Sequence, residues 1–163
     1  MKKIFLTTAI AALLSVNVFA ADGGKKVVEK ADGEANVSYV ALHYFNVDFA
    51  DAKNVSWTVT KTCQKATFVV DGVKKTAFYN LNGEYLGVTQ RVDSKAIPAK
   101  TLKQINKQYP GYEIGEVIVY QANTSFNDSI DETSYFVDIK NDAHEVLLRI
   151  NQQANLEFFQ TVK

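Results

Sequence analysis

The residues of this chain that could do chemistry are few, and they lie far apart in the sequence. The two histidines, His43 and His144, have no second histidine or cysteine at the spacing of metal ligands. The one cysteine, Cys63, has no marked base beside it to activate a thiol nucleophile. We therefore expect no metal site, no cofactor and no nucleophilic enzyme.

Carboxylates and glycines could also build a site, but their arrangement argues against one. Residues 127–132 hold several oxygen donors without the alternating order and the glycine of a calcium loop. Neither a Gly-x-Ser-x-Gly motif nor a glycine-rich phosphate loop occurs. Four further carboxylates could supply the acid pair of a glycosidase: Glu84, Glu116, Asp138 and Glu145. Their location on a solvated sheet face is the simpler explanation. We expect a protein that is not an enzyme and has no catalytic residues.

Residues 1–20 have the layout of a secretory signal peptide. Two lysines precede an uncharged apolar stretch, and Val18 and Ala20 occupy the two positions that a signal peptidase tests. A membrane anchor is the alternative, but the stretch is shorter than the ~20 residues of a bilayer span and contains polar residues. We expect cleavage after Ala20 and a soluble protein in the periplasm or the medium, without a lipid anchor because no cysteine follows the stretch.

Charge and cysteine content limit the partners and the means of stabilisation. Cleavage leaves 16 basic residues against 18 acidic ones, a net charge of −2, and the basic residues do not cluster. A nucleic-acid or membrane-surface partner is therefore not expected. Because Cys63 is single, no internal disulfide can form, and core packing must hold the domain together. We expect Cys63 to be a half-buried small apolar residue on a strand; the alternative is a thiol that pairs with another chain.

The first half of the mature chain reads as a helix followed by four strands. Residues 21–36 are polar and glycine-rich, which is typical of a flexible leader. Apolar residues then recur at helical spacing until about residues 52–54, with Asn36 or Ser38 as the cap. The predicted buried stripe consists of Val37, Val40, Ala41, Tyr44, Phe45 and Phe49. Alternating strands follow, joined by hairpin turns at Asp71-Gly72 and Asn82-Gly83.

The second half repeats this order. Pro98 opens a helical pattern that Pro110-Gly111 ends, and four strand patterns follow between residues 114 and 159. We expect an α+β fold of two tandem helix-plus-four-strand repeats, about 37–93 and about 94–163, within one domain. The repeats should form one antiparallel sheet of about eight strands with two helices on one face, because each helix has only one narrow apolar stripe.

Several turns and caps resemble those of a known family, the PepSY-like, β-lactamase-inhibitor-like periplasmic proteins of Bacteroidetes. The matching pieces are the entry strand 54–57, the hairpin 66–72, the turn 79–84, the helix start Ile97-Pro98 and the helix end 109–112. The resemblance covers roughly residues 37–163 and implies a tandem α/β repeat with a curved sheet. These motifs concern structure, so the resemblance does not carry inhibition of β-lactamases to this chain.

The function expected from these observations is binding. If the helices cover one sheet face, strand alternation places four interface-type residues on the open face: Tyr85, Arg91, Arg149 and Phe159. Cross-strand pairing on an exposed face would explain the same residues. We expect an exported binding module whose open face takes a protein or peptide partner. The alternative is an envelope carrier of a small molecule or ion, with a pocket between helices and sheet.

Overall fold

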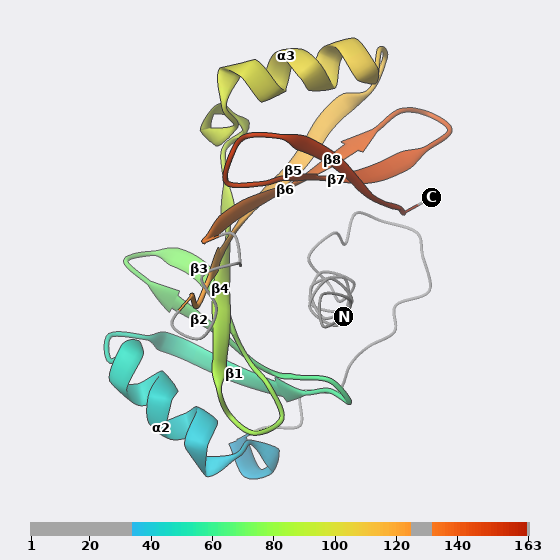
Figure 1. Ribbon diagram of the computed structural model, residues 1–163. Coiled ribbons are helices and arrows are strands. Elements are labelled where there is room, and N and C mark those ends of the chain that lie inside the picture. Colours follow the sequence, from blue (N-terminus) through green and yellow to red (C-terminus); the bar gives the residue numbers. More distant parts are fainter. Residues whose placement is uncertain (1–33, 125–131, 163) are drawn as a thin grey trace. The chain divides into compact units, whose positions relative to one another are not determined.

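The computed structural model describes residues 34–124 and 132–162 (Figure 1). They form one antiparallel sheet whose strands follow one another in chain order from β1 to β8. Within these residues the helices are α2 (Tyr39–Asp48) and α3 (Ala99–Gln108), and the short 3-10 turns are η1 (Glu34–Asn36) and η2 (Ser94–Ala96). The strands are β1 (Lys53–Val59), β2 (Gln64–Val70), β3 (Val73–Tyr79), β4 (Tyr85–Val92), β5 (Glu113–Ala122), β6 (Thr133–Lys140), β7 (Glu145–Ile150) and β8 (Leu156–Thr161). The predicted fold class is confirmed.

The expected signal peptide and most of the expected leader lie outside the described residues, and only the last three leader residues form η1. The chain divides into two compact units at Leu86/Gly87, inside β4. From Gly87 onward β4 pairs with β5, which ties the rest of that strand to the following residues. The predicted repeat boundary, near residue 93, falls at the end of the same strand.

The N-terminal unit (described residues 34–86) is built on an aromatic core under α2. The Ser38 hydroxyl caps the helix by accepting a hydrogen bond from the Ala41 N–H at 3.2 Å. The Phe45 ring then packs edge-on against Trp57 of β1 and Phe68 of β2, with centroid separations of 5.3 and 5.0 Å. The predicted helix is confirmed and its core contact is aromatic, but it ends at Asp48 and not near residues 52–54, where β1 has already begun.

The predicted buried stripe of this helix is partly wrong. Ala41 and Phe45 are buried, whereas Val40 and Tyr44 are exposed to solvent. The helix is apolar on nearly all sides, so periodicity alone could not decide which of its faces meets the sheet.

Polar contacts fasten the β3–β4 loop to the start of α2. The buried Gln64 side chain accepts a hydrogen bond from the Ser38 N–H at 2.7 Å and donates one to the Asn80 carbonyl at 2.8 Å. Gly83 has a φ of +90°, and a Cβ there would lie 2.7 Å from the Ser38 Oγ. The turn is therefore a five-residue loop between Tyr79 and Tyr85, and not the predicted two-residue hairpin.

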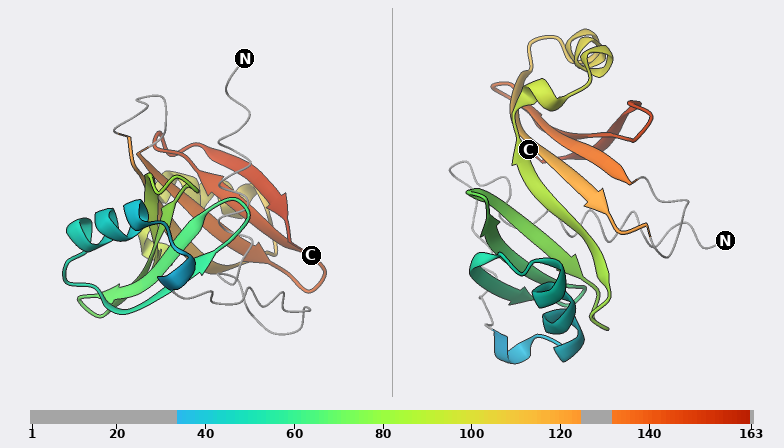
Figure 2. Two further views of the ribbon diagram at one scale, coloured as in Figure 1. Left: turned by 90° about the horizontal axis from the view of Figure 1, so that it is seen from below. Right: turned by 90° about the vertical axis from the view of Figure 1, so that its left-hand side faces the viewer.

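In the C-terminal unit (described residues 87–162) α3 lies beside the strands of the sheet (Figure 2), and the core between them is aliphatic. Ile97 and Ile105 pack with buried residues of β5, β6 and β7, namely Val117, Val137, Ile139, Val146, Leu148 and Ile150. The buried Thr101 hydroxyl donates to the Ala154 carbonyl at 2.9 Å and so ties α3 to the β7–β8 turn. As predicted, Pro98 precedes the helix and stands at its N-cap.

The other face of the N-terminal unit holds a small second cluster. Cys63 is buried against Phe78 of β3, and Leu86 of β4 packs on both. Leu86 therefore does not face a helix, whereas the predicted place of Tyr85 on the open face puts Leu86 on the helix side by strand alternation. Its neighbour Tyr85 takes that side instead, since successive strand residues point to opposite faces.

Candidate interaction surface

Strand register brings five residues of the C-terminal unit into one line across the sheet. Arg91 pairs with Ile118, Ile118 with Phe136, and Phe136 with Arg149. Arg149 then pairs with Glu157 of β8. We call these five residues the transverse row, and it includes two of the four residues predicted to bind a partner.

The transverse row lies on the sheet face away from α3. The strand neighbours Val92, Val117 and Leu148 belong to the core that packs on α3. Because side chains alternate along a strand, Arg91, Ile118 and Arg149 point the other way. The predicted placement of Arg91 and Arg149 opposite the helix is therefore supported by the register.

Arg91 and Glu116 form an ion pair at the β4 end of the transverse row. The Arg91 side chain is 68 % exposed and that of Glu116 only 17 % exposed. An exposed pair of this kind adds little stability. Its consequence is geometric, because the carboxylate restrains the guanidinium while leaving most of it open to solvent.

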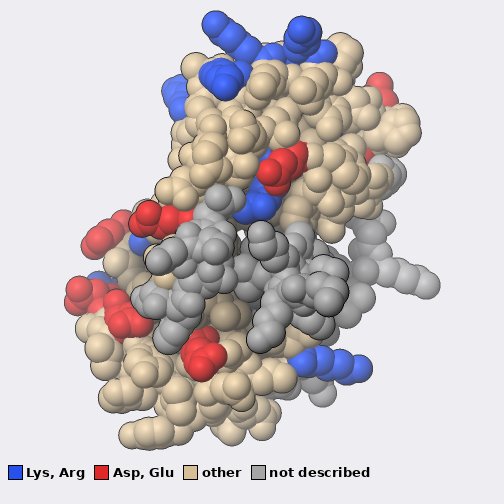
Figure 3. All heavy atoms as spheres, viewed as in Figure 1, with Lys and Arg blue, Asp and Glu red and all other residues tan. Residues whose placement is uncertain are grey.

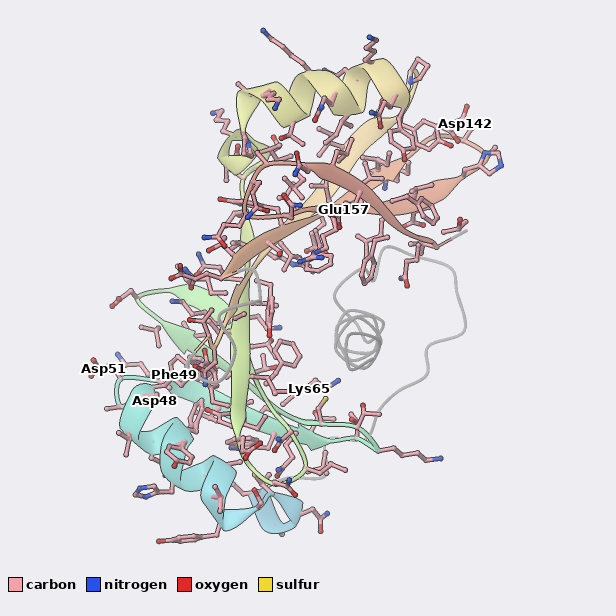
Figure 4. All side chains as sticks on the ribbon, in the orientation of Figure 1. Asp48, Phe49, Asp51, Lys65, Asp142 and Glu157 are labelled. Atoms are coloured by element: carbon pink, nitrogen blue, oxygen red, sulfur yellow. The ribbon has the colours of Figure 1, made fainter. Side chains whose placement is uncertain are left out.

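Arg149 is held more firmly, near the other end of the row. One guanidinium nitrogen donates to the Ser134 hydroxyl at 3.1 Å, and a second lies 3.4 Å from a Glu157 carboxylate oxygen. The other Glu157 oxygen accepts a hydrogen bond from the Asn151 amide at 3.1 Å. Figure 4 shows Glu157 projecting from β8. Three strands thus fix the orientation of the Arg149 fork.

Phe159 covers the middle of the row. Its ring meets the buried Phe136 ring edge-on at 5.1 Å, with an interplanar angle of 77°. The pairing of β7 with β8 shifts register between Leu147 and Leu148, opposite this residue. Such a bulge redirects a side chain. Phe159 therefore lies over Phe136, half-buried, as predicted for the face opposite the helix.

Tyr85, the remaining predicted residue, lies elsewhere. Its ring contacts Phe49, at the end of α2, with centroids 6.0 Å apart, and contacts Tyr79 at 5.5 Å. It therefore belongs to the aromatic core of the N-terminal unit and not to an open face. The predicted face of Tyr85 was wrong. A shift of one residue in the alternation along β4 exchanges the sheet faces of Tyr85 and Leu86.

Tyr120 packs closely beside the transverse row without forming part of it. The Tyr120 side chain occupies the space next to Gly87, where a Cβ would lie 2.7 Å from its hydroxyl. Burial raises the pKa of Tyr120 to about 12, so the hydroxyl stays protonated at neutral pH. Tyr120 is thus a neutral, packed support of the surface.

A buried carboxyl lies two residues beyond Phe136 on β6. Asp138 is 5 % exposed, and Gly115 of β5 leaves room for it, since a Cβ at Gly115 would collide with the carboxylate. Burial raises the pKa of Asp138 to about 6; the charge of Glu145 and a hydrogen bond with it act in the same direction, and Lys140 opposes them. Asp138 is therefore expected to titrate just below neutral pH.

The chemistry available on this surface is recognition by charge and by aromatic contact. Within residues 34–124 and 132–162, histidine, cysteine and carboxylate side chains do not gather in threes at a common point where a metal could bind. Nor is any helix in these ranges both long and apolar enough to cross a membrane. What the surface does offer is two oriented guanidinium groups and one aromatic ring, the residue types that dominate binding energies at interfaces.

Comparisons with known proteins identify the fold. No family model and no curated protein matches the sequence. Among solved structures, the chain is similar to a BLIP-like protein from Bacteroides fragilis, with 16% identity, a TM-score of 0.63, and coverage of 77% of this chain and 86% of that one. It is also similar to a DUF2874 family protein from Bacteroides uniformis (10% identity, TM-score 0.63, 74% and 86% covered) and to a proposed periplasmic protein from Bacteroides eggerthii (10%, 0.66, 77% and 89%). The predicted resemblance is therefore confirmed as a BLIP-like fold.

Sequence reasoning missed the residues that organise the surface. Phe136 and Ile118 lie in strands that are apolar on both faces, so alternation does not reveal which side they take. Ser134 and Glu157 support Arg149 from neighbouring strands, and Glu116, expected only as part of a solvated face, supports Arg91; the register alone brings them together. The one sequence signal for these supporting residues was the presence of the arginines themselves, since a guanidinium group pairs readily with a carboxylate.

Proposed function

We propose that the chain is an exported, non-enzymatic binding module that takes a protein or peptide partner on the transverse row. The observation that carries this proposal is the joint placement of Arg91, Arg149 and Phe159 on one sheet face, with Arg149 oriented by Ser134 and Glu157. Preorganised arginine forks beside an aromatic ring lose little entropy on binding an acidic or polar segment. The sequence of residues 1–20 and the proposed periplasmic neighbour support a periplasmic location.

The test is capture from the host periplasm with wild-type protein and an Arg91→Glu/Phe159→Ser variant. Both side chains are accessible enough for replacement without opening the core. The matched control, Val73→Ser/Lys74→Glu, combines a charge reversal and an apolar-to-serine replacement in the same way, at exposed positions of β3. We expect a protein that wild type and control retain and the surface variant loses. Equal recovery by all three proteins, or recovery by none, would refute binding at this surface.

A second candidate function, carriage of a small polar molecule, is favoured by one observation in the N-terminal unit. The Trp57 Nε1 and the Tyr79 hydroxyl are buried and have no hydrogen-bond partner in the described part of the chain. Their rings lie 5.7 Å apart under α2. Two such polar groups on neighbouring buried rings would suit a small hydrogen-bonding guest. Native mass spectrometry of protein from its host would test this, and a mass equal to that of the polypeptide would contradict it.

A further inference from the structure

The outer face of α2 is apolar and aromatic although it faces solvent. Tyr39 is 81 % exposed, Val47 64 % and Tyr44 48 %. With Val40 and His43, these residues recur at the spacing of one helix face. The rings of Tyr39 and His43 stack with centroids 6.4 Å apart, so part of the surface is preformed. We call these five residues the outer stripe.

Folding of the N-terminal unit does not explain the outer stripe. The core contacts of α2 come from the opposite face, through Ala41 and Phe45. A solvent-facing helix surface ordinarily carries charged residues. A contiguous exposed apolar surface is typical of an interaction site. The outer stripe therefore has the character of a binding face.

The charge around the outer stripe is acidic. The sequence of α2 contains no lysine or arginine, and Glu34 precedes the helix. Asp48 and Asp51 are exposed at its C-terminal end, where Figure 4 labels both. Carboxylates at a helix C-terminus oppose the helix dipole, so they do not stabilise α2 itself. A cation brought to this end would be favourable.

The other helix of the same chain carries the complementary surface. Lys100, Lys103 and Lys107 are exposed on α3, at the spacing of one helix face, and the helix contains no acid. Figure 3 shows blue basic side chains gathered over α3, and those of the helix itself are lysines. Lysine stems pack along aromatic surface while their ammonium groups reach π faces and carboxylates. At ten residues each, both helices are about 15 Å long and can lie along one another.

We propose that the outer stripe docks on the lysine face of α3 of a second copy of this chain. The contact is heterologous, so a dimer keeps one unused α2 on one copy and one unused α3 on the other, and association continues into short chains of molecules. A contact of one helix on one helix is smaller than the ~1,600 Å² of a standard interface, so the association is weak and concentration-dependent. It involves a surface other than the transverse row and stands independently of the proposed function.

Sedimentation velocity of the processed protein, from micromolar to millimolar concentration, tests the proposal. We expect the average mass to rise with concentration and the rise to diminish in high salt. Tyr44→Ser/Val47→Ser and Lys103→Glu/Lys107→Glu should each weaken association about tenfold or more. The charge control Lys61→Glu/Lys74→Glu changes exposed lysines of the β1–β2 turn and β3, and should associate like wild type.

Mixing the two variants separates this contact from its alternatives. Each variant retains one intact half, so an equimolar mixture should form dimers and nothing larger, at concentrations where each variant alone associates about tenfold or more weakly than wild type. A wild-type protein that remains monomeric at millimolar concentration would overturn the proposal. Association abolished by the α2 variant but unaffected by the α3 variant would also overturn it, since α2 would then meet another surface.

Discussion

Replacement of Asp138 by asparagine should stabilise the protein above pH 6 and leave it nearly unchanged in acid. In the folded protein the pKa of this carboxyl is about 6, against an ordinary value of 3.8. The folded state therefore holds the proton more tightly than the unfolded state. Protonation of Asp138 therefore raises the free energy of unfolding as the pH falls from 6 towards 4. Above pH 6 this contribution is absent.

The magnitude follows from the two pKa values. A difference of about two pKa units corresponds to about 3 kcal/mol, which the folded protein forgoes when Asp138 is ionised. Asparagine fits the same space beside Gly115, cannot ionise, and can donate to Glu145 as the protonated carboxyl does. Because relaxation and water reduce such costs, we expect Asp138→Asn to gain about 1–3 kcal/mol at about pH 8.

Urea unfolding at several pH values is the assay. It should be followed by circular dichroism, because Trp57 lies in the N-terminal unit and its fluorescence reports that unit. Glu113→Gln, an exposed neutralisation on β5, is the control and should show no pH-dependent gain. A gain of equal size at about pH 5 and about pH 8, or a loss at about pH 8, would refute the assignment of the titration to Asp138.

Three further predictions concern the stability of the fold. Gly83→Ala should lower the free energy of unfolding by about 2–4 kcal/mol, because its Cβ would meet Ser38 and Val40. Gly72→Ala, at φ +77° with open space around it, should lower it by about 1 kcal/mol. Equal losses in urea unfolding would contradict the close approach at Gly83. Gln64→Met should cost about 2–4 kcal/mol, because Ser38 N–H and the Asn80 carbonyl lose their buried partner; faster amide exchange at Ser38 is the specific readout, and unchanged exchange would contradict it. Ala154→Gly should stabilise by about 0.5–1 kcal/mol, because Ala154 has a φ of +60° and glycine relieves that strain; a lower melting temperature would contradict this.

Local sequence signals predicted the elements well because each one acts within a few residues. Alternation marked the strands, and Asp71-Gly72 adopts the two positive φ values, 52° and 77°, that its tight turn requires. Ser38 does cap α2, as one of the two predicted alternatives. The Asn82-Gly83 turn was predicted less well, since its shape depends on Gln64 and Ser38, which are distant in sequence.

Which face a residue occupies was harder to predict. Tyr85 and Leu86 lie on the sheet faces opposite to those expected, because no residue within β4 indicates which of the strand's two alternating faces packs on α2. Val40 and Tyr44 were assigned to the core although they form part of the outer stripe. In both cases the apolar residues outnumber the positions that one face can bury, so the tertiary contacts select among them.

The sequence by itself determined the element order, the duplication and the absence of an internal disulfide, because these follow from periodicity, turn chemistry and a single cysteine. It also supplied three residues of the candidate surface by their types. Only the tertiary structure decided that Arg91 and Arg149 stand in one row with Phe136 between them and Phe159 above it. Register and bulges arise from pairing between strands many residues apart, and no local pattern encodes that pairing.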